Sequence, residues 1–177
     1  AGAAESSAGG AMRVKRQKRL RRVIRFFKVA HGFRAPYKVL LDGNFIHALH
    51  TMGQGAASAA VPRALGEAAR LFTTRGVCTE LKGMGERCAA ALAEAKATHL
   101  VSDAAANAAG LSARESILLA VGEANAGRYV VATQDESLKA ALGAVPAVPV
   151  LFASQSGVSV EPPSDAQSRL AAEVEEA

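Results

Sequence analysis

The first clear pattern along the chain is an apolar stripe with helical spacing. Four large apolar residues stand at positions i, i+3, i+4 and i+7 and so share one helix face: Leu20, Val23, Ile24 and Phe27. Glycine commonly ends a helix and proline resists extending one, so Gly32 and Pro36 place the end of this helix near residue 32. The spacing predicts one amphipathic helix in this part of the chain.

Three short apolar runs further on predict β-strands. Residues 37–42 read Tyr-Lys-Val-Leu-Leu-Asp, and residues 128–135 read Arg-Tyr-Val-Val-Ala-Thr-Gln-Asp. Both runs are rich in residues that favour strands, and both end in an acid. Residues 148–152, Val-Pro-Val-Leu-Phe, predict the last strand.

Helical patterns follow the first strand. Phe45, Ile46 and Leu49 indicate a helix that Gly53 closes, and residues 53–60 have the Gly, Ala and Ser content of a loop. The next helix is expected to carry a proline in its first turn, where its missing N–H does no harm. The proline is Pro62, and the expected buried face consists of Leu65, Ala69 and Phe72.

The second half of the chain continues the alternation. Helical stretches are expected to run to Leu81 and to Lys96, residues 98–111 resemble a loop, Ser112 opens another helix, and a short helix covers residues 138–142. Strands that alternate with helices predict an α/β fold with a central parallel sheet.

Composition divides the chain into four parts. Residues 1–11 are mostly Ala, Gly and Ser without periodicity, so we expect a disordered leader. Residues 12–36 form a basic helical arm, residues 37–156 form the globular domain, and residues 157–177 form a polar, acidic tail.

Charge is strongly segregated between these parts. Eleven of the twenty-one Lys and Arg residues lie between Arg13 and Lys38 with no acid among them, whereas residues 39–177 hold ten basic against fifteen acidic residues. Such clustered cations indicate a polyanionic partner, because each neutralised phosphate releases condensed counterions. The candidate RNA-binding residues are Arg13, Lys15, Arg16, Lys18, Arg19, Arg21, Arg22, Arg25 and Lys28.

The basic arm allows three interpretations. It could be a helix docked on a partner with its cations on RNA, a helix that lies on a membrane surface or binds a calmodulin-like protein, or a solvated localisation signal. No continuous apolar stretch reaches the length of a transmembrane helix.

Four acids stand where a metal site could form. Asp42 and Asp135 end two strands, and parallel α/β sheets place their sites at that edge; Glu80 and Glu115 lie in or at flanking helices. Four converging carboxylates would hold one or two Mg²⁺ or Mn²⁺ ions that activate water for phosphodiester cleavage.

Each of these acids also has a structural interpretation. Asp135 could cap the next helix, and Glu115 could form a capping box with Ser112. Glu80 could lie on a solvated helix face, and Asp42 could be a turn residue. Spacing alone leaves the two interpretations open.

The order of several motifs resembles one known family. The matching segments are Gly32-Phe-Arg-Ala-Pro-Tyr-Lys-Val-Leu-Leu-Asp-Gly-Asn-Phe45, Thr74-Arg-Gly-Val-Cys-Thr-Glu-Leu81, Tyr129-Val-Val-Ala-Thr-Gln-Asp135 and Val145-Pro-Ala-Val-Pro-Val150. Together with the basic arm they resemble the nucleolar PIN-domain proteins of ribosomal small-subunit assembly, over roughly Met12 to Pro162. The match is closest to the branch whose PIN domains are degenerate.

The resemblance implies a fold, a compartment and partners. It implies a PIN-like three-layer α/β/α sandwich, residence in the small-subunit processome of the nucleolus, and contact with pre-rRNA, a small nucleolar RNA and other processome proteins. It implies no membrane role.

The resemblance also assigns the acids. Asp42 matches the first PIN acid, Glu80 the second and Asp135 the fourth, while Glu115 sits where active PIN nucleases usually hold Asp. The sister family ends the last of these strands in Thr-Val-Asp-x-Asp, whereas this chain has Thr-Gln-Asp-Glu-Ser at residues 133–137. The expected function is therefore RNA and protein binding without catalysis; the alternative is a metal-dependent PIN endoribonuclease.

Relatives in the family carry a Cys-Cys-His-Cys zinc site around residues 98–116. This chain offers only His99 there, with alanines at 104–106 and a serine at 116. A structural zinc ion needs four donors, so we expect no zinc and no other cofactor, with Mg²⁺ or Mn²⁺ only for the nuclease alternative. Cys78 and Cys88 are interpreted as small buried hydrophobic residues.

Overall fold

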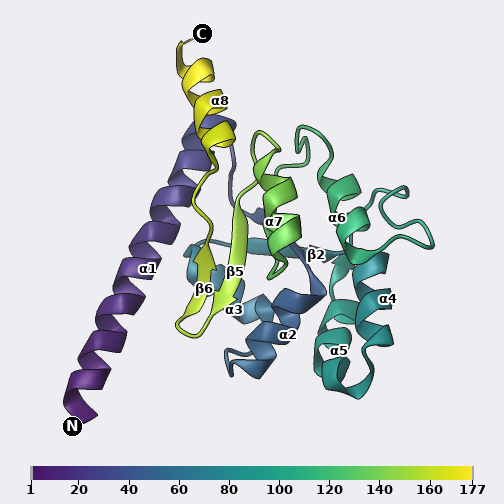
Figure 1. Ribbon diagram of the computed structural model, residues 1–177, viewed down its shortest axis with the longest axis horizontal. Helices are drawn as coiled ribbons and strands as arrows, with labels where there is room; N and C mark the ends of the chain where they lie inside the picture. Colours follow the sequence, from purple (N-terminus) through teal and green to yellow (C-terminus); the bar gives the residue numbers. More distant parts are fainter. Residues whose placement is uncertain (1, 177) are drawn as a thin grey trace.

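Six strands form one sheet in the computed structural model, which describes residues 2–176 (Figure 1). Their order is β3-β2-β1-β4-β5-β6; the first five are parallel, and β6 runs antiparallel to β5. The strands are β1 (Tyr37–Leu41), β2 (Ala69–Thr73), β3 (His99–Leu100), β4 (Tyr129–Ala132), β5 (Val150–Ser154) and β6 (Gly157–Val160). This sheet confirms the predicted α/β class.

Helices lie on both sides of the sheet, and α1 lies beside its β6 edge (Figure 1). They are α1 (Gly2–His31), α2 (Gly43–Thr51), α3 (Ala57–Leu65), α4 (Arg75–Gly83), α5 (Ala89–Ala97), α6 (Ala113–Val121), α7 (Glu136–Gly143) and α8 (Asp165–Glu176), with a 3₁₀ turn η1 (Gly85–Cys88). Across residues 2–176, no helix is both long enough and apolar enough to traverse a bilayer.

The two central strands are buried along most of their length. Val39, Leu40 and Leu41 of β1 and Val130 and Val131 of β4 are fully buried. A parallel strand covered by helices on both faces needs apolar residues on both faces, which explains these near-continuous apolar runs. The two strand-end acids therefore directly follow the buried central strands.

Helix α1 contributes to this core. The four stripe residues predicted from spacing, Leu20, Val23, Ile24 and Phe27, are all buried, none more than 7% exposed. They face the body where α1 contacts β6, α3 and α8 (Figure 1). The C-terminal half of the arm is therefore an integral part of the fold, as an amphipathic helix with one buried face should be.

Two boundaries near α3 differ from the expectation. The helix begins at Ala57 and ends at Leu65, so Pro62 lies inside it and the segment 57–60 is helical. Gly66 ends the helix with a left-handed φ of +70°, and residues 69–73 form β2 beside β1. The expected helical face through Ala69 and Phe72 was wrong, because a left-handed glycine stops the helix and pairing with β1 makes the following residues a strand.

Both ends of the chain also differ from the expectation. Residues 2–11, expected to be a disordered leader, continue α1 as helix, which suits their alanine content. Beyond residue 156, expected to be a tail, β6 extends the sheet and α8 follows. Gln167 fixes α8 to the body by donating to the carbonyl oxygen of Val145 at 3.0 Å, so the fold continues past the expected domain boundary.

Candidate functional site

Asp42 and Asp135 lie at the carboxyl edge of neighbouring strands, as the sequence predicts. β1 pairs with β4 so that Leu41 lies opposite Ala132, and the two acids follow these strands. Each acid is also the N-cap of the helix that it precedes, α2 for Asp42 and α7 for Asp135. The strand-edge position of both acids and the capping interpretation of Asp135 are confirmed, whereas Asp42 caps α2 in place of the turn role that its structural interpretation gave it.

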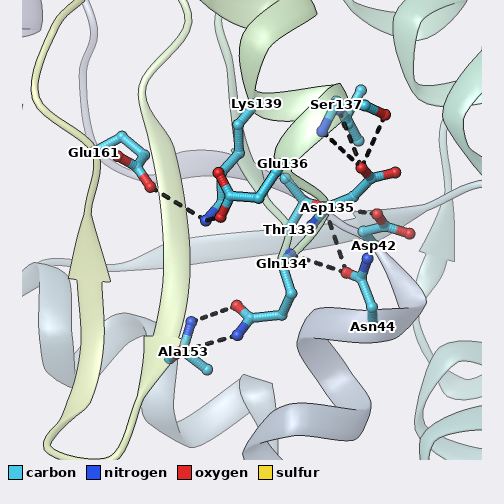
Figure 2. A network of polar contacts seen from close by, with 11 residues as sticks. Asp42, Asn44, Thr133, Gln134, Asp135, Glu136, Ser137, Lys139, Ala153 and Glu161 are labelled. Atoms are coloured by element: carbon cyan, nitrogen blue, oxygen red, sulfur yellow. Dashed lines mark hydrogen bonds and ion pairs between the residues drawn. The ribbon is translucent and has the colours of Figure 1, made fainter.

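The carboxylate of Asp42 is buried and hydrogen-bonded. It is 5% exposed, and its Oδ2 accepts a hydrogen bond from Thr133 Oγ1 at 2.7 Å (Figure 2). Its Oδ1 accepts one from the N–H of Gly43 at 2.8 Å. Burial raises the pKa of Asp42 to about 6, although these hydrogen bonds lower it, and the charges of Glu80 and Asp135 raise it further. Burial is thus a larger cause of the shift than repulsion between acids.

Two amides extend this network to the next strand. Asn44 Oδ1 accepts the N–H of Gln134 at 3.0 Å (Figure 2). The side chain of Gln134 then mimics a strand pair, because its Nε2 donates to the carbonyl oxygen of Ala153 at 2.9 Å and its Oε1 accepts that residue's N–H at 2.6 Å. Asn44, Thr133 and Gln134 had no predicted role, although all three lie in the motifs that carry the family resemblance.

Asp135 is held in its ionised form. Its Oδ1 accepts the N–H groups of Ser137 at 2.9 Å and Leu138 at 3.3 Å, and the hydroxyl of Ser137 at 2.9 Å (Figure 2). Burial raises the pKa of Asp135, but these donors and the charge of Arg114 outweigh it, so the pKa lies below its usual range. The two neighbouring acids are therefore shifted in opposite directions.

Glu80 shares a cavity with Asp42. The cavity has a volume of about 190 Å³, and its lining includes Val77, Leu81 and Met84 beside the two acids. Its wall also contains two ionisable groups that were not predicted from the sequence, since neither belongs to a strand end: His47 and Arg87. The exposed Glu80 carboxylate also accepts the N–H of Ala113, the first residue of α6, at 3.4 Å.

Glu115 is engaged at the start of α6. Its Oε2 accepts the N–H of Ser112 at 3.5 Å, and its own N–H donates to Ser112 Oγ at 3.1 Å, which completes a capping box. Within residues 2–176, no three His, Cys, Asp or Glu side chains gather closely enough to hold a metal ion. Glu115 is thus engaged within the fold of α6, as its structural interpretation predicts.

The cations of α1 cover the faces that its apolar stripe leaves free. Among the described residues, Lys28 forms an ion pair with Glu67 at 3.3 Å, and no other α1 cation has an acidic partner. The exposed members are Arg13, Lys15, Lys18, Arg19, Arg21, Arg22, Arg25 and Lys28, whereas Arg16 is half-buried. One helix therefore presents a dense cationic surface to solvent.

The chain matches the model of a known protein family. A family model described as Fcf1 matches residues 63–162, more than half of the chain. The chain belongs to the Fcf1 family. The match covers β2 to β6, and the segment with β1 and the basic arm precedes it.

Individual relatives agree with the Fcf1 assignment. The "rRNA-processing protein utp23" of Schizosaccharomyces pombe is 32% identical over 157 residues, which are 88% of this chain. The chain spans 60% of the length of that relative. Among solved structures, the "PIN domain endonuclease Utp24" superposes with a TM-score of 0.66 and 25% identity, covering 75% of this chain and 97% of that one. The PIN-like α/β/α fold is thereby confirmed.

Within this Fcf1-family chain, an asparagine fixes the loop after β3. Asn107 Nδ2 donates to the carbonyl oxygen of Val101 at 2.7 Å, and its Oδ1 accepts the N–H of Arg75 at the start of α4 at 3.1 Å. Ala106 beside it is fully buried. One side chain thus joins the loop to a helix in the segment where this chain lacks the zinc ligands that the family resemblance implies for its relatives.

Buried hydroxyl groups join two helices beside this loop. Ser116 and Thr74 are fully buried, and their hydroxyl oxygens lie 2.7 Å apart in a hydrogen bond that joins α4 to α6. Cys88 is buried and Cys78 half-buried, both as free thiols. Burial also raises the pKa of the Cys78 thiol, which suits a packing role.

Proposed function

We propose that this protein is a non-catalytic RNA- and protein-binding factor for small-subunit rRNA processing in the nucleolus, and that it contacts pre-rRNA and a small nucleolar RNA. The observation that carries the proposal is the cationic surface of α1, exposed along its length and largely without acidic partners among the described residues. The relative named as an rRNA-processing protein supports the same role. The body serves as a docking platform, and the protein needs no metal or other cofactor.

The chemistry of α1 fits contact with RNA backbone. Arg and Lys recognise phosphate through charge and N–H donors, so binding should depend strongly on salt and weakly on base sequence. Base stacking needs exposed aromatic rings, but Phe27 and Phe33 are buried and Phe26 is half-buried. The cations therefore account for most of the expected affinity.

A salt titration tests this role. Replacing Arg19, Arg21, Arg22 and Arg25 with Ala should weaken RNA binding and flatten its dependence on salt, by about 0.7–0.9 in the log–log slope for each phosphate that the protein no longer neutralises. The matched control removes four exposed cations from the body: Arg70, Lys82, Lys96 and Arg169. An unchanged slope in the arm variant, or an equal effect in the control, would refute the proposal.

The alternative function is a metal-dependent endoribonuclease. It is favoured by the cavity that Asp42 shares with Glu80 and by the likeness to a PIN-domain endonuclease. Against it, Glu115 is engaged in a capping box and the acids do not form a metal-ligand set within the described residues. Incubation of the purified protein with single-stranded RNA and Mn²⁺ separates the two functions, because RNA cleavage that Asp42→Asn abolishes would replace the binding proposal with the nuclease.

A further inference from the structure

A groove of about 630 Å³ lies where α1 meets α3 and the turn between β5 and β6. Three arginines line it, Arg13 and Arg16 from α1 and Arg63 from α3. Gln17 and Gln155 add side-chain amides, and no acidic residue is part of the lining. The groove is thus built from positive charge and hydrogen-bond donors contributed by separate elements.

Arg16 packs closely against the turn between β5 and β6. A Cβ on Gly157 would lie 2.8 Å from Nη2 of Arg16 and 2.9 Å from its Cζ, so the guanidinium packs directly over the glycine. The backbone of Gly157 has a φ of +126°, which a residue with a side chain rarely adopts. The turn therefore provides a glycine where the arginine needs close approach.

The guanidinium of Arg16 lacks an acceptor. Its Nη1 is buried, and it has no hydrogen-bond partner among the described residues. A buried donor without a partner is unfavourable, and native structures seldom leave one so. The orphaned N–H group marks a place where an acceptor from outside the chain would be stabilised.

The charges in the groove also favour an anion. Burial lowers the pKa of Arg16, and the charge of Arg13 lowers it further. None of the three arginines forms an ion pair with a described residue. An anion bound between them would relieve this repulsion and satisfy the orphaned donor.

We propose that this groove binds a phosphodiester group of the RNA backbone, with Arg16 as the principal donor and Arg13 and Arg63 beside it. The inference rests on the proposed RNA-binding function and gives it a defined anchor. RNA is the occupant that fits, because two of the arginines continue the cationic surface of α1 into the groove, so one strand can contact both.

Charge-conserving variants test the anchor. A planar guanidinium can donate two parallel hydrogen bonds to a phosphate, which a lysine ammonium cannot reproduce. Arg16→Lys should therefore weaken binding of a single-stranded RNA about tenfold at fixed salt, the effect of removing one charge-assisted hydrogen bond. The matched control, Arg169→Lys, changes an exposed arginine of α8 that lies outside both the arm and the groove, so it should change the affinity less than about twofold.

A second pair of variants uses exposed residues, which can be replaced without risk to folding. Arg63→Ala and Arg70→Ala remove the same charge, but only Arg63 lines the groove. Arg63→Ala should weaken binding severalfold and Arg70→Ala less than about twofold. Thermal unfolding of every variant verifies that the fold is intact.

The outcomes separate the anchor from the function on which it rests. If the groove variants match their controls while the Arg19, Arg21, Arg22 and Arg25 variant fails to bind RNA, the groove is not a site and the proposed function stands. If the unaltered protein binds no RNA, both proposals fail. Selective weakening in Arg16→Lys and Arg63→Ala supports the groove.

Discussion

Asp42 illustrates how one buried carboxyl group sets a pH response. Its folded pKa of about 6 lies above that of an unfolded aspartate, about 3.9. The folded state therefore holds this proton more tightly than the unfolded state does. The contribution of Asp42 to the free energy of unfolding is fully present below pH 4 and is lost as the pH rises through 6.

We expect Asp42→Asn to stabilise the protein at neutral pH. The amide is uncharged, so it avoids the burial of a carboxylate, and its oxygen can still accept the N–H of Gly43. The gain in unfolding free energy should be small near pH 4 and reach up to about 3 kcal/mol above pH 7, which is the energy of a shift of about two pKa units. Urea unfolding at several pH values measures it.

Asp135→Asn is the control for this prediction, because it should change the stability at neutral pH in the opposite direction. The folded pKa of Asp135 is lowered, so its stabilising contribution is present at neutral pH and is lost as the pH falls. The asparagine variant should be less stable at pH 7. Similar pH profiles for the two variants would contradict the opposite environments described for the two acids.

At the residue scale, the sequence predicts what local spacing determines. The capping box of Ser112 with Glu115 and the N-cap role of Asp135 follow from residue types within three positions. The bond from Thr133 to Asp42 joins residues 91 positions apart and exists only because β1 pairs with β4. Such a contact is invisible until the sheet order is known.

At the element scale, the loop after β3 depends on Asn107. Replacing Asn107 with Ala would leave the N–H of Arg75 and the carbonyl oxygen of Val101 without this partner. We expect a decrease of about 1–3 kcal/mol in unfolding free energy and faster amide exchange in residues 101–112. Urea unfolding and hydrogen exchange measure the two effects.

The control for this loop lies within it. Ser102 is exposed, so Ser102→Ala should leave both measurements unchanged. A chelator should also leave the unaltered protein unchanged, because we propose that Asn107 fixes the loop without zinc. A fall in stability on chelation would show that a metal holds this segment.

Helix α1 provides the second element-scale prediction. Phe27 is 1% exposed and packs edge-on against Phe33 with ring centroids 5.8 Å apart. Phe27→Ala should reduce the unfolding free energy by about 3–5 kcal/mol, whereas Val29→Ala, at a side chain 72% exposed on the same helix, should change it little. Equal, small effects in calorimetry would mean that α1 is detached from the body in solution.

Elements with strong local signals were predictable, and those that depend on distant pairing were not. The stripe of α1 and the runs of β1 and β4 carry clear periodicity or β-rich composition. β2 was mistaken for helix because Ala69 and Phe72 continue a helical stripe that begins at Leu65, and only pairing with β1 decides the conformation. β6 was not predicted, because the short segment 157–160 is a strand only through its pairing with β5.

At the scale of the whole molecule, one helix, α1, both carries the cationic surface and contributes side chains to the core. The body beyond residue 38 carries more acids than bases, whereas α1 carries the cations and also buries Leu20 and Phe27. Opposite charge between the body and α1 adds long-range attraction that salt screens, whereas the burial of the apolar stripe stabilises the docked helix without depending on charge. The surface proposed to bind RNA is therefore preformed.

Because α1 both carries the cations and belongs to the core, RNA should act as a folding ligand. An RNA that binds only the folded chain raises its unfolding free energy by about 2.7 kcal/mol at a concentration one hundred times the Kd. The melting temperature should rise with RNA concentration and fall back as salt is added. A flexible tail would bind RNA equally in the folded and unfolded states and give no such rise. Because α1 is packed on the body, calorimetry can therefore report RNA binding through the melting temperature.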